Sequence, residues 1–240
     1  MAMSDAAEMA ALRERFPKLP PFSAAYQALT IVATNAYLLY LLLHDEGSPV
    51  AFALFGVLEL VAWSVIANTA LYPVPKDQRV GSPDVPLSTR VAAIVFFSAF
   101  LLGIAWVCVP DREHIDALVQ ARNPVVTLDD LHILWPLLAS IAFAGSGSIN
   151  DLMRWRRVGG PFVTGTAMAA SSKFITAIVA PVAAALLAGF GDAAHKALVW
   201  SSIYLAIKAG SELLMLGWQS IGMPDRPPES QKPRAKARVR

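Results

Sequence analysis

Residues 49–71 read PVAFALFGVLELVAWSVIANTAL, and the single ionisable side chain among them is Glu59. About 20 consecutive apolar residues in a helix are enough to cross the hydrocarbon core of a bilayer. Because an unpaired backbone amide in that layer costs several kcal/mol, a helix is the expected conformation. The stretch therefore predicts a membrane-spanning helix with one carboxyl group near its midpoint.

Five further apolar stretches lie on either side of this one. They are Ala24–Leu43, Val91–Val109, Leu131–Ser148, a fifth stretch that ends at Phe190, and Ala194–Gly217. Hydrophobic residues make up 55% of the chain and charged residues 16%, whereas soluble domains are about 45–50% apolar and about 25% charged. The sequence therefore predicts an all-α polytopic membrane helix bundle of about six transmembrane helices over residues 24–218.

The segments that flank the bundle differ in character from it. Residues 1–23 form a predicted cytoplasmic or interfacial segment, with an amphipathic pattern over Ser4–Phe16. Residues 219–240 are rich in Pro, Lys and Arg and predict a disordered basic tail.

The connections between the spans predict which helices are neighbours. The short connections His44–Ser48 and Gly191–Asp192 indicate that the first pair of helices, and also the last pair, lie antiparallel side by side. Two starting points stay possible for the fifth helix, because the apolar run that begins at Pro161 is longer than a helix needs to be to cross a bilayer. Either the whole run is a tilted helix, or the span begins near Ser171. Pro136 and Pro181 lie inside predicted spans, where proline favours a kink.

Lysine and arginine gather on one predicted side of the membrane. If the N-terminal segment, residues 72–90, residues 150–173 and the tail share one side, that side carries sixteen of the twenty Lys and Arg. The positive-inside rule then places both termini in the cytoplasm and indicates a bacterial inner membrane protein. The basic tail is also a candidate contact for anionic lipid.

Three ionisable residues lie inside predicted spans, namely Glu59, Lys208 and Glu212. A charge at the centre of a span costs about 2.5–3.5 kcal/mol on insertion scales, so such residues are functional candidates by default. Lys208 and Glu212 are one helical turn apart, and Ser201, Tyr204 and Ser211 recur on the same face. This polar stripe is predicted to face the bundle interior.

Two interpretations of these residues stay open. In the first, Asn35, Glu59, Tyr204, Lys208 and Glu212 form a buried polar site between the first, second and sixth helices. Such a site would bind or translocate a small polar solute, an ion or a proton. In the second, the charges only lock the helices together: Glu59 pairs with Lys208 or Lys173, and Glu212 lies at the membrane interface.

Other chemistries find no support in the sequence. There is no phosphate-binding Gly-rich loop and no GxSxG turn, so an intramembrane enzyme ranks last, no catalytic residue is assigned and any cofactor is unknown. The histidines fall on the predicted outer side without metal-ligand spacing, so no metal site is predicted. They are His44, His114, His132 and His195. The single cysteine, Cys108, cannot form an internal disulfide. Nothing indicates nucleic acid as a partner, whereas a second copy of the chain or another membrane protein stays open.

Three segments together resemble a bacterial multi-pass membrane family that is known only as a domain of unknown function. They are Asn35 followed by FALFGVLELVAWSVIAN around Glu59, then FAGSGSINDLMRWRR, and finally Lys208-x-x-x-Glu212. They are similar to that family's apolar helix with a central Glu, its Ser-rich helix end with basic residues, and the Lys and acid of its last helix. The resemblance implies a multi-pass helical fold and no activity, because none is attached to the family. It implies that Asn35, Glu59, Lys208 and Glu212 are the positions to test.

Overall fold

A computed structural model describes residues 21–44, 46–75, 87–110, 124–158, 162, 165–189 and 196–221. Within these ranges the chain is all-helical, with seven α-helices and no β-strand. The helices are α2 (Pro21–Leu43), α3 (Pro49–Ala70), α4 (Leu87–Cys108), α6 (Pro124–Asp130), α7 (Leu134–Val158), α8 (Gly165–Ala188) and α9 (Lys196–Ile221). Six of the seven are long, and α6 is a short helix that precedes α7.

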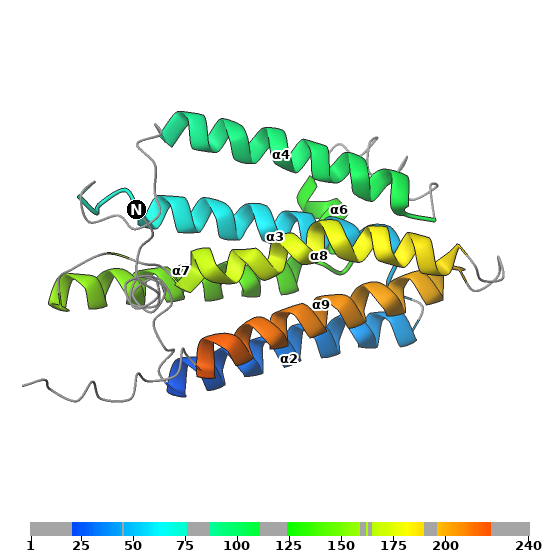
Figure 1. The fold of residues 1–240 in the computed structure, drawn as a ribbon. Coiled ribbons are helices and arrows are strands. Elements are labelled where there is room, and N and C mark those ends of the chain that lie inside the picture. The colour runs from blue at the N-terminus through cyan, green and yellow to red at the C-terminus, as the bar shows by residue number, and fades with distance from the viewer. Residues whose placement is uncertain are drawn as a thin grey trace, which may run out of the picture.

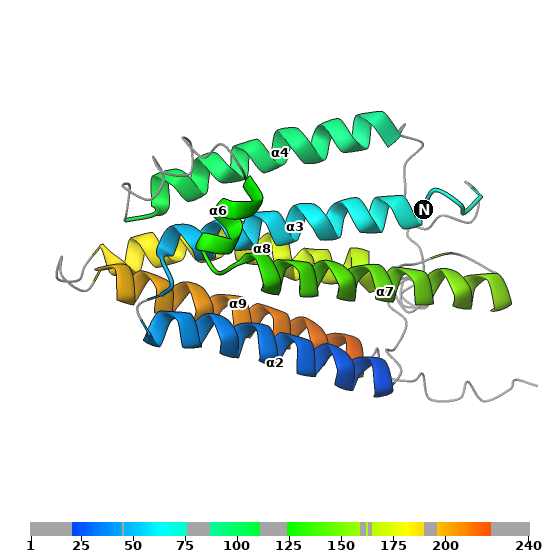
Figure 2. The same ribbon diagram turned by 180° about the vertical axis from the view of Figure 1, so that it is seen from behind.

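The six long helices run side by side and alternate in direction (Figure 1). Helix α4 forms one outer layer, α3, α7 and α8 form the middle, and α2 and α9 form the opposite outer layer (Figures 1 and 2). One end of the bundle therefore gathers the starts of α2, α4 and α8 with the ends of α3, α7 and α9. The other end gathers the starts of α3, α7 and α9.

The neighbours in the bundle agree only in part with those predicted from the short connections. Helix α8 packs along α9, which confirms the prediction for the last pair. The prediction for the first pair is wrong, because α2 packs along α9 rather than α3. One hydrogen bond and the limited core shared by α2 and α3 explain this arrangement. Asn35 of α2 donates a hydrogen bond to Glu212 of α9, and α2 shares a core with α3 only near the connecting turn, where Leu41 and Phe52 are buried.

Several helix limits also differ from the predicted ones. Helix α7 continues to Val158, well past Ser148, with Arg156 and Arg157 in its last turn, where cations stabilise the helix dipole. Because α7 begins at Leu134, Pro136 lies in its first turn, where proline is tolerated without a kink. Helix α8 begins at Gly165, between the two predicted limits, and contains Pro181 in its interior. The predicted amphipathic segment 4–16 and the tail from residue 222 lie outside the described residues.

Two helices are long and apolar enough to cross a membrane by length and composition, namely residues Ala24–Leu43 of α2 and Pro49–Ala70 of α3. Shorter apolar helical stretches occur in α4 and α8, at Ala92–Ala105 and Ser172–Ala188. These results support membrane spans in part of the predicted set and leave the number six as a prediction.

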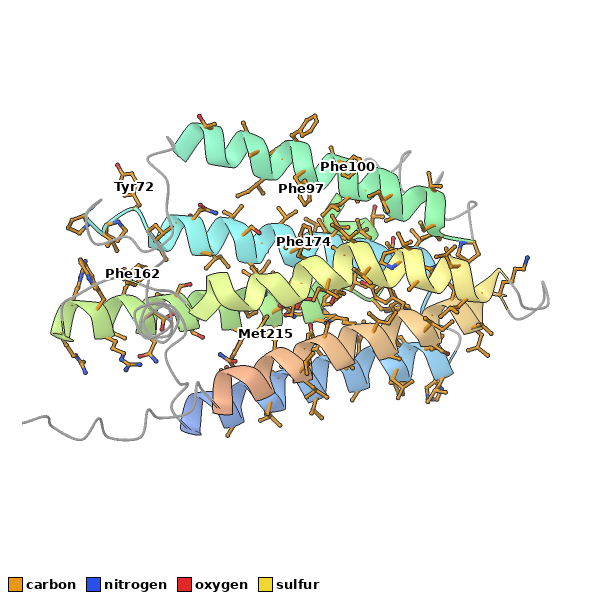
Figure 3. All side chains as sticks on the ribbon, viewed as in Figure 1. Tyr72, Phe97, Phe100, Phe162, Phe174 and Met215 are labelled. Carbon is orange, nitrogen blue, oxygen red and sulfur yellow. The ribbon has the colours of Figure 1, made fainter. Side chains whose placement is uncertain are left out.

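The bundle has an apolar core and also exposes many large apolar side chains. Large apolar side chains of α4 face outward, and Phe96 is 77% exposed. The inward side of α4 is also apolar, because Phe97 stacks on Phe174 of α8 with ring centroids 5.6 Å apart (Figure 3). In contrast, two glutamates and two lysines are buried between the helices. Contiguous apolar surface of this kind marks a contact with lipid or with another protein.

Candidate functional site

Four charged side chains meet in the middle of the bundle: Glu59 of α3, Lys173 of α8, and Lys208 and Glu212 of α9. Lys173 Nζ lies 2.8 Å from Glu59 Oε1, and Lys208 Nζ lies 3.4 Å from Glu59 Oε2. Both ammonium groups also contact Glu212 Oε1. All four side chains are buried. We call this group the tetrad; it contains two positive and two negative charges and so carries no net charge.

The local sequence explains how the tetrad is held. Lys208 and Glu212 are four residues apart, which places them on the same face of α9. Lys173 is followed on α8 by Ala177, Ala180 and Ala184, all fully buried. Small side chains at such positions allow neighbouring helices to approach closely. Because α8 contacts both α3 and α9, Lys173 can reach the carboxylates of both helices.

Neutral side chains add hydrogen bonds to the two carboxylates, although Glu59 Oε2 accepts none within the described residues. Ser140 Oγ of α7 donates to Glu59 Oε1 at 2.6 Å, and Trp63 Nε1 donates to Ser140 Oγ at 2.9 Å. Asn35 Nδ2 donates to Glu212 Oε2 at 2.8 Å. Hydrogen bonds to an ionised acceptor are stronger than neutral ones, which offsets part of the desolvation of these carboxylates. Each glutamate therefore has two cationic neighbours and one neutral donor.

Aromatic rings lie beside both lysines. The ring centroid of Trp63 is 5.2 Å from Lys173 Nζ, and that of Phe55 is 5.4 Å from Lys208 Nζ. Cations are attracted to ring faces at such distances, most strongly where water is excluded. The rings thus add to the stabilisation of the two buried ammonium groups.

A partly open cavity of about 40 Å³ adjoins the tetrad. A cavity needs about 10–15 Å³ to hold one water molecule, so this volume accommodates about three. Its wall includes the four tetrad side chains and polar residues of α2, namely Gln27, Thr30 and Thr34. Met215 of α9, labelled in Figure 3, contributes an apolar part of the wall. The cavity thus combines buried charges with neutral hydrogen-bonding groups.

The cavity lies on one side of the tetrad only. On α2 its lining residues precede Asn35, and on α9 they continue past Glu212 to Leu216. We call this side, where α2 begins and α9 ends, the open half. The opposite side, where α3 and α9 begin, is a packed core that we call the closed half. Six of its side chains are at most 1% exposed, namely Leu38, Leu41, Phe52, Phe55, Trp200 and Tyr204.

Most of the residues predicted as the polar site lie together. Asn35, Glu59, Lys208 and Glu212 are in mutual contact through the bonds described above, although the site spans five helices rather than three. The side chain of Glu212 is 2% exposed and touches both lysines, and its place at the membrane interface stays a prediction. The predicted inward face of the α9 stripe is confirmed, since Ser201, Tyr204 and Lys208 are fully buried.

Tyr204 differs from the other predicted site residues. It lies one turn before Lys208 in the closed half and is absent from the cavity wall. Its hydroxyl has no hydrogen-bond partner within the described part of the chain. A Cβ added at Gly56 would lie 2.1 Å from that hydroxyl oxygen, so the ring tip packs directly on the α3 backbone.

Trp63 and Ser140 escaped the prediction of the site, and Lys173 was expected only in the second interpretation, as an alternative partner of Glu59. Both contacts named there, from Glu59 to Lys173 and to Lys208, are present. Lys173 was assigned to the cytoplasmic face, as a residue at the start of the fifth helix, yet it is two turns inside α8. Its spacing from Ala177, Ala180 and Ala184 marks one helix face and was a usable signal. Trp63 lies four residues after Glu59 on α3 and was also detectable by spacing. Nothing in the sequence distinguishes Ser140 from other serines in apolar helices.

The described residues contain no group of three or more His, Cys, Asp or Glu side chains that could hold a metal ion. His114 and His195, two of the four histidines, lie outside those residues. Searches against protein-family models, curated proteins and solved structures give no match to this chain. The resemblance of its three segments to a family of unknown function therefore stays a prediction.

Proposed function

We propose that the chain is a multi-pass inner membrane protein with six spans and both termini in the cytoplasm. Three observations support this topology: the apolar outer surface, the buried charges, and the alternating direction of six long helices. The basic residues Arg154, Arg156 and Arg157 are exposed at the end of α7, at the same end of the bundle as the open half. The positive-inside rule assigns that end to the cytoplasm.

Reporter fusions test the topology. A reporter that is active only in the cytoplasm, fused at either chain end, is expected to be active at both. A fusion within the connection between α2 and α3 is expected to be active only with a periplasmic reporter. If the cytoplasmic reporter is active at only one chain end, the two ends lie on opposite sides of the membrane, which would contradict six spans.

Within this topology, we propose that the protein binds and translocates a small polar solute, an ion or a proton at the tetrad. The observation that carries the proposal is a cavity that has polar groups of α2 in its wall and ends on four buried charges. The charge balance of the tetrad favours a solute with no net charge over a single ion. A lone ion would enter a desolvated site in which every charge already has opposite partners, so its desolvation would remain uncompensated.

Flux into proteoliposomes tests the proposal with three probes: radiolabelled glycerol, rubidium ions and protons followed by an internal pH dye. The wild-type protein is expected to raise the flux of at least one probe above that of empty liposomes. The double variant Glu59→Gln/Lys208→Met removes one charge of each sign, so it is expected to fold and to lose that flux. Leu214→Ala, an exposed change on the same helix, serves as the matched control and retains it. Equal flux in the wild type and the double variant would refute the proposal.

A structural role in a larger membrane complex is the second candidate, because each tetrad charge already contacts two opposite charges. In this case the tetrad only fixes helix packing. Single changes such as Lys208→Met leave an unbalanced buried charge and reduce the amount of folded protein under either candidate, and the double variant restores part of it. The two candidates therefore differ in flux. Under the structural role, wild-type and double-variant proteoliposomes would not differ in the flux of any probe.

A further inference from the structure

We infer that the tetrad is accessible from the open half only, and that the Tyr204 side chain is the seal that separates it from the other side of the membrane. The inference rests on the proposed function, because it concerns access to the same site. It changes the role of Tyr204 from a residue that contacts the solute to one that controls its passage. Four observations lead to it.

The first observation is a continuous aromatic stack directly beside the tetrad. The rings of Trp200 and Tyr204 lie 5.3 Å apart at an angle of 9°, and those of Tyr204 and Phe52 lie 6.5 Å apart at 11°. The stack links α9 to α3 at the level where the cavity ends. All three side chains are buried, so the rings occupy the interior between these helices at this level.

The second observation is that a hydrogen bond holds Trp200, which forms one end of the stack. Trp200 Nε1 donates a hydrogen bond to the backbone carbonyl oxygen of Cys108, the last residue of α4, at 3.0 Å. Phe52 lies one turn into α3, which begins behind the Ser48 cap. The two outer members of the stack are therefore held, whereas the ring of Tyr204 between them makes no hydrogen bond.

The third observation is the fit of Tyr204 against Gly56. The hydroxyl oxygen occupies the space that any side chain at position 56 would need. Only glycine permits this contact, so closure of the bundle at this level depends on the Tyr204–Gly56 pair. Lys208 and Glu59 lie on the same helices, one turn further along, which places the seal directly next to the tetrad.

The fourth observation is that two buried hydroxyls, one at the seal and one on its closed side, lack hydrogen-bond partners within the described residues. Ser201 Oγ and the Tyr204 hydroxyl are both fully buried and lack hydrogen-bond partners in the part of the chain that the structure describes. An unpaired buried hydroxyl costs free energy. Both groups gain partners if Tyr204 leaves Gly56 and water enters, so the polar stripe of α9 supplies a path from Lys208 to Ser201 in an opened state.

Cysteine labelling in membrane vesicles tests the inference, with Cys108→Ala as the cysteine-free background. A charged, membrane-impermeant methanethiosulfonate is applied to one side or the other, in vesicles of both orientations. Thr34→Cys places a thiol in the cavity wall, and Ser201→Cys places one beyond the seal. Thr34→Cys is expected to react only from the open half. Ser201→Cys is expected to react about 100-fold more slowly from either side, because a closed thiol reacts only through transient opening.

Removal of the Tyr204 side chain should accelerate the labelling of Ser201→Cys and leave the labelling of Thr34→Cys unchanged. With Tyr204→Ala added, Ser201→Cys is expected to react from the open half within about threefold of the Thr34→Cys rate, since both thiols then face one aqueous space. Tyr204→Phe keeps the ring and is expected to leave Ser201→Cys protected. Phe52→Leu is a milder change in the same stack and is expected to accelerate labelling to an intermediate rate. A monodisperse elution profile verifies that each variant is folded.

Two labelling results would overturn the inference. The first leaves the proposed function standing, and the second does not. If Ser201→Cys reacts as fast as Thr34→Cys in the presence of Tyr204, there is no seal, although flux through the tetrad can still be present. If Thr34→Cys is unreactive from both sides, the open half gives no access to a polar solute of the size of the reagent, and the proposed function fails together with the inference for such solutes.

Discussion

Helices α2, α3 and α9 contribute to both the closed and the open half of the bundle, yet the two halves are packed differently. In the closed half, Leu38, Phe52 and Trp200 fill the interior to at most 1% exposure. In the open half, the corresponding turns of α2 present Gln27, Thr30 and Thr34 to a cavity. One half therefore gains its stability from close packing, and the other leaves room for water or a solute.

The tetrad lies at the boundary between these two environments. Lys208 is fully buried and lies over Phe55 of the closed half, whereas the side chain of Lys173 is 7% exposed and lies over Trp63 in the cavity wall. Buried charges need both opposite charges and access to polar groups. A position between a dry core and a polar cavity supplies both, so the boundary is where the bundle can hold four charges at least cost.

The largest expected effect is the loss of one tetrad cation. Lys208→Met leaves two carboxylates with one ammonium group in a dry environment and is expected to reduce stability by about 3–5 kcal/mol. Lys173→Met should cost less, because cavity water can approach the carboxylates on that side. Thermal unfolding in detergent measures both. An equal loss for the two variants would show that the halves do not differ in polarity at the tetrad.

A matched pair of phenylalanines compares packing in the two halves. Phe52→Ala removes a fully buried ring of the closed half and is expected to cost about 3 kcal/mol, because the surrounding helices cannot fill the space. Phe143→Ala removes a ring of the cavity wall that packs on Tyr26 and Trp63. Its expected cost is about 1 kcal/mol, the value of lost aromatic contacts. Denaturation of both variants under one condition tests the difference; similar costs would mean that the open half is also tightly packed.

The long helices and most of the tetrad were accessible to sequence analysis for one physical reason. Long apolar runs and isolated charges have large transfer free energies, so their place relative to the membrane follows from composition alone. This is why Glu59 and Lys208 were recognised as buried. Lys173 was named only as an alternative partner of Glu59, because its depth depends on where α8 begins, and a run of small residues with no clear start leaves that limit undetermined.

The arrangement of the helices was less accessible, because it depends on contacts between distant residues. A short turn between α2 and α3 suggests that they are neighbours, yet the bond from Asn35 to Glu212 and the packing of α2 on α9 outweigh it. The division into an open and a closed half was also not predictable from the sequence. It arises from which turn of each helix meets which turn of its neighbour, and a one-dimensional pattern does not contain that information.

The seal itself allows a smaller and more specific prediction. Gly56→Ala places a Cβ 2.1 Å from the Tyr204 hydroxyl oxygen, which must then move, so a loss of about 1–3 kcal/mol is expected. Tyr204→Phe removes that oxygen, and the next ring carbon is 3.4 Å away, an ordinary contact. The double variant is therefore expected to recover most of the loss. Gly103→Ala, at which an added Cβ meets nothing within 4 Å, is the control and should be neutral or slightly stabilising. Failure of Tyr204→Phe to rescue Gly56→Ala would show that the clash is relieved elsewhere.

The smallest expected effects on stability come from single hydroxyls on either side of the tetrad. Thr34→Val preserves shape in the cavity wall and should change stability by less than about 0.5 kcal/mol. It removes a hydrogen-bonding group from the path of the solute, so solute flux should fall about threefold to tenfold, the equivalent of one hydrogen bond. Ser201→Ala removes an unpaired hydroxyl from the closed half and should raise stability by about 1 kcal/mol. If Ser201→Ala instead lowers stability, its hydroxyl has a partner in the membrane, and the closed half is not dry at that level.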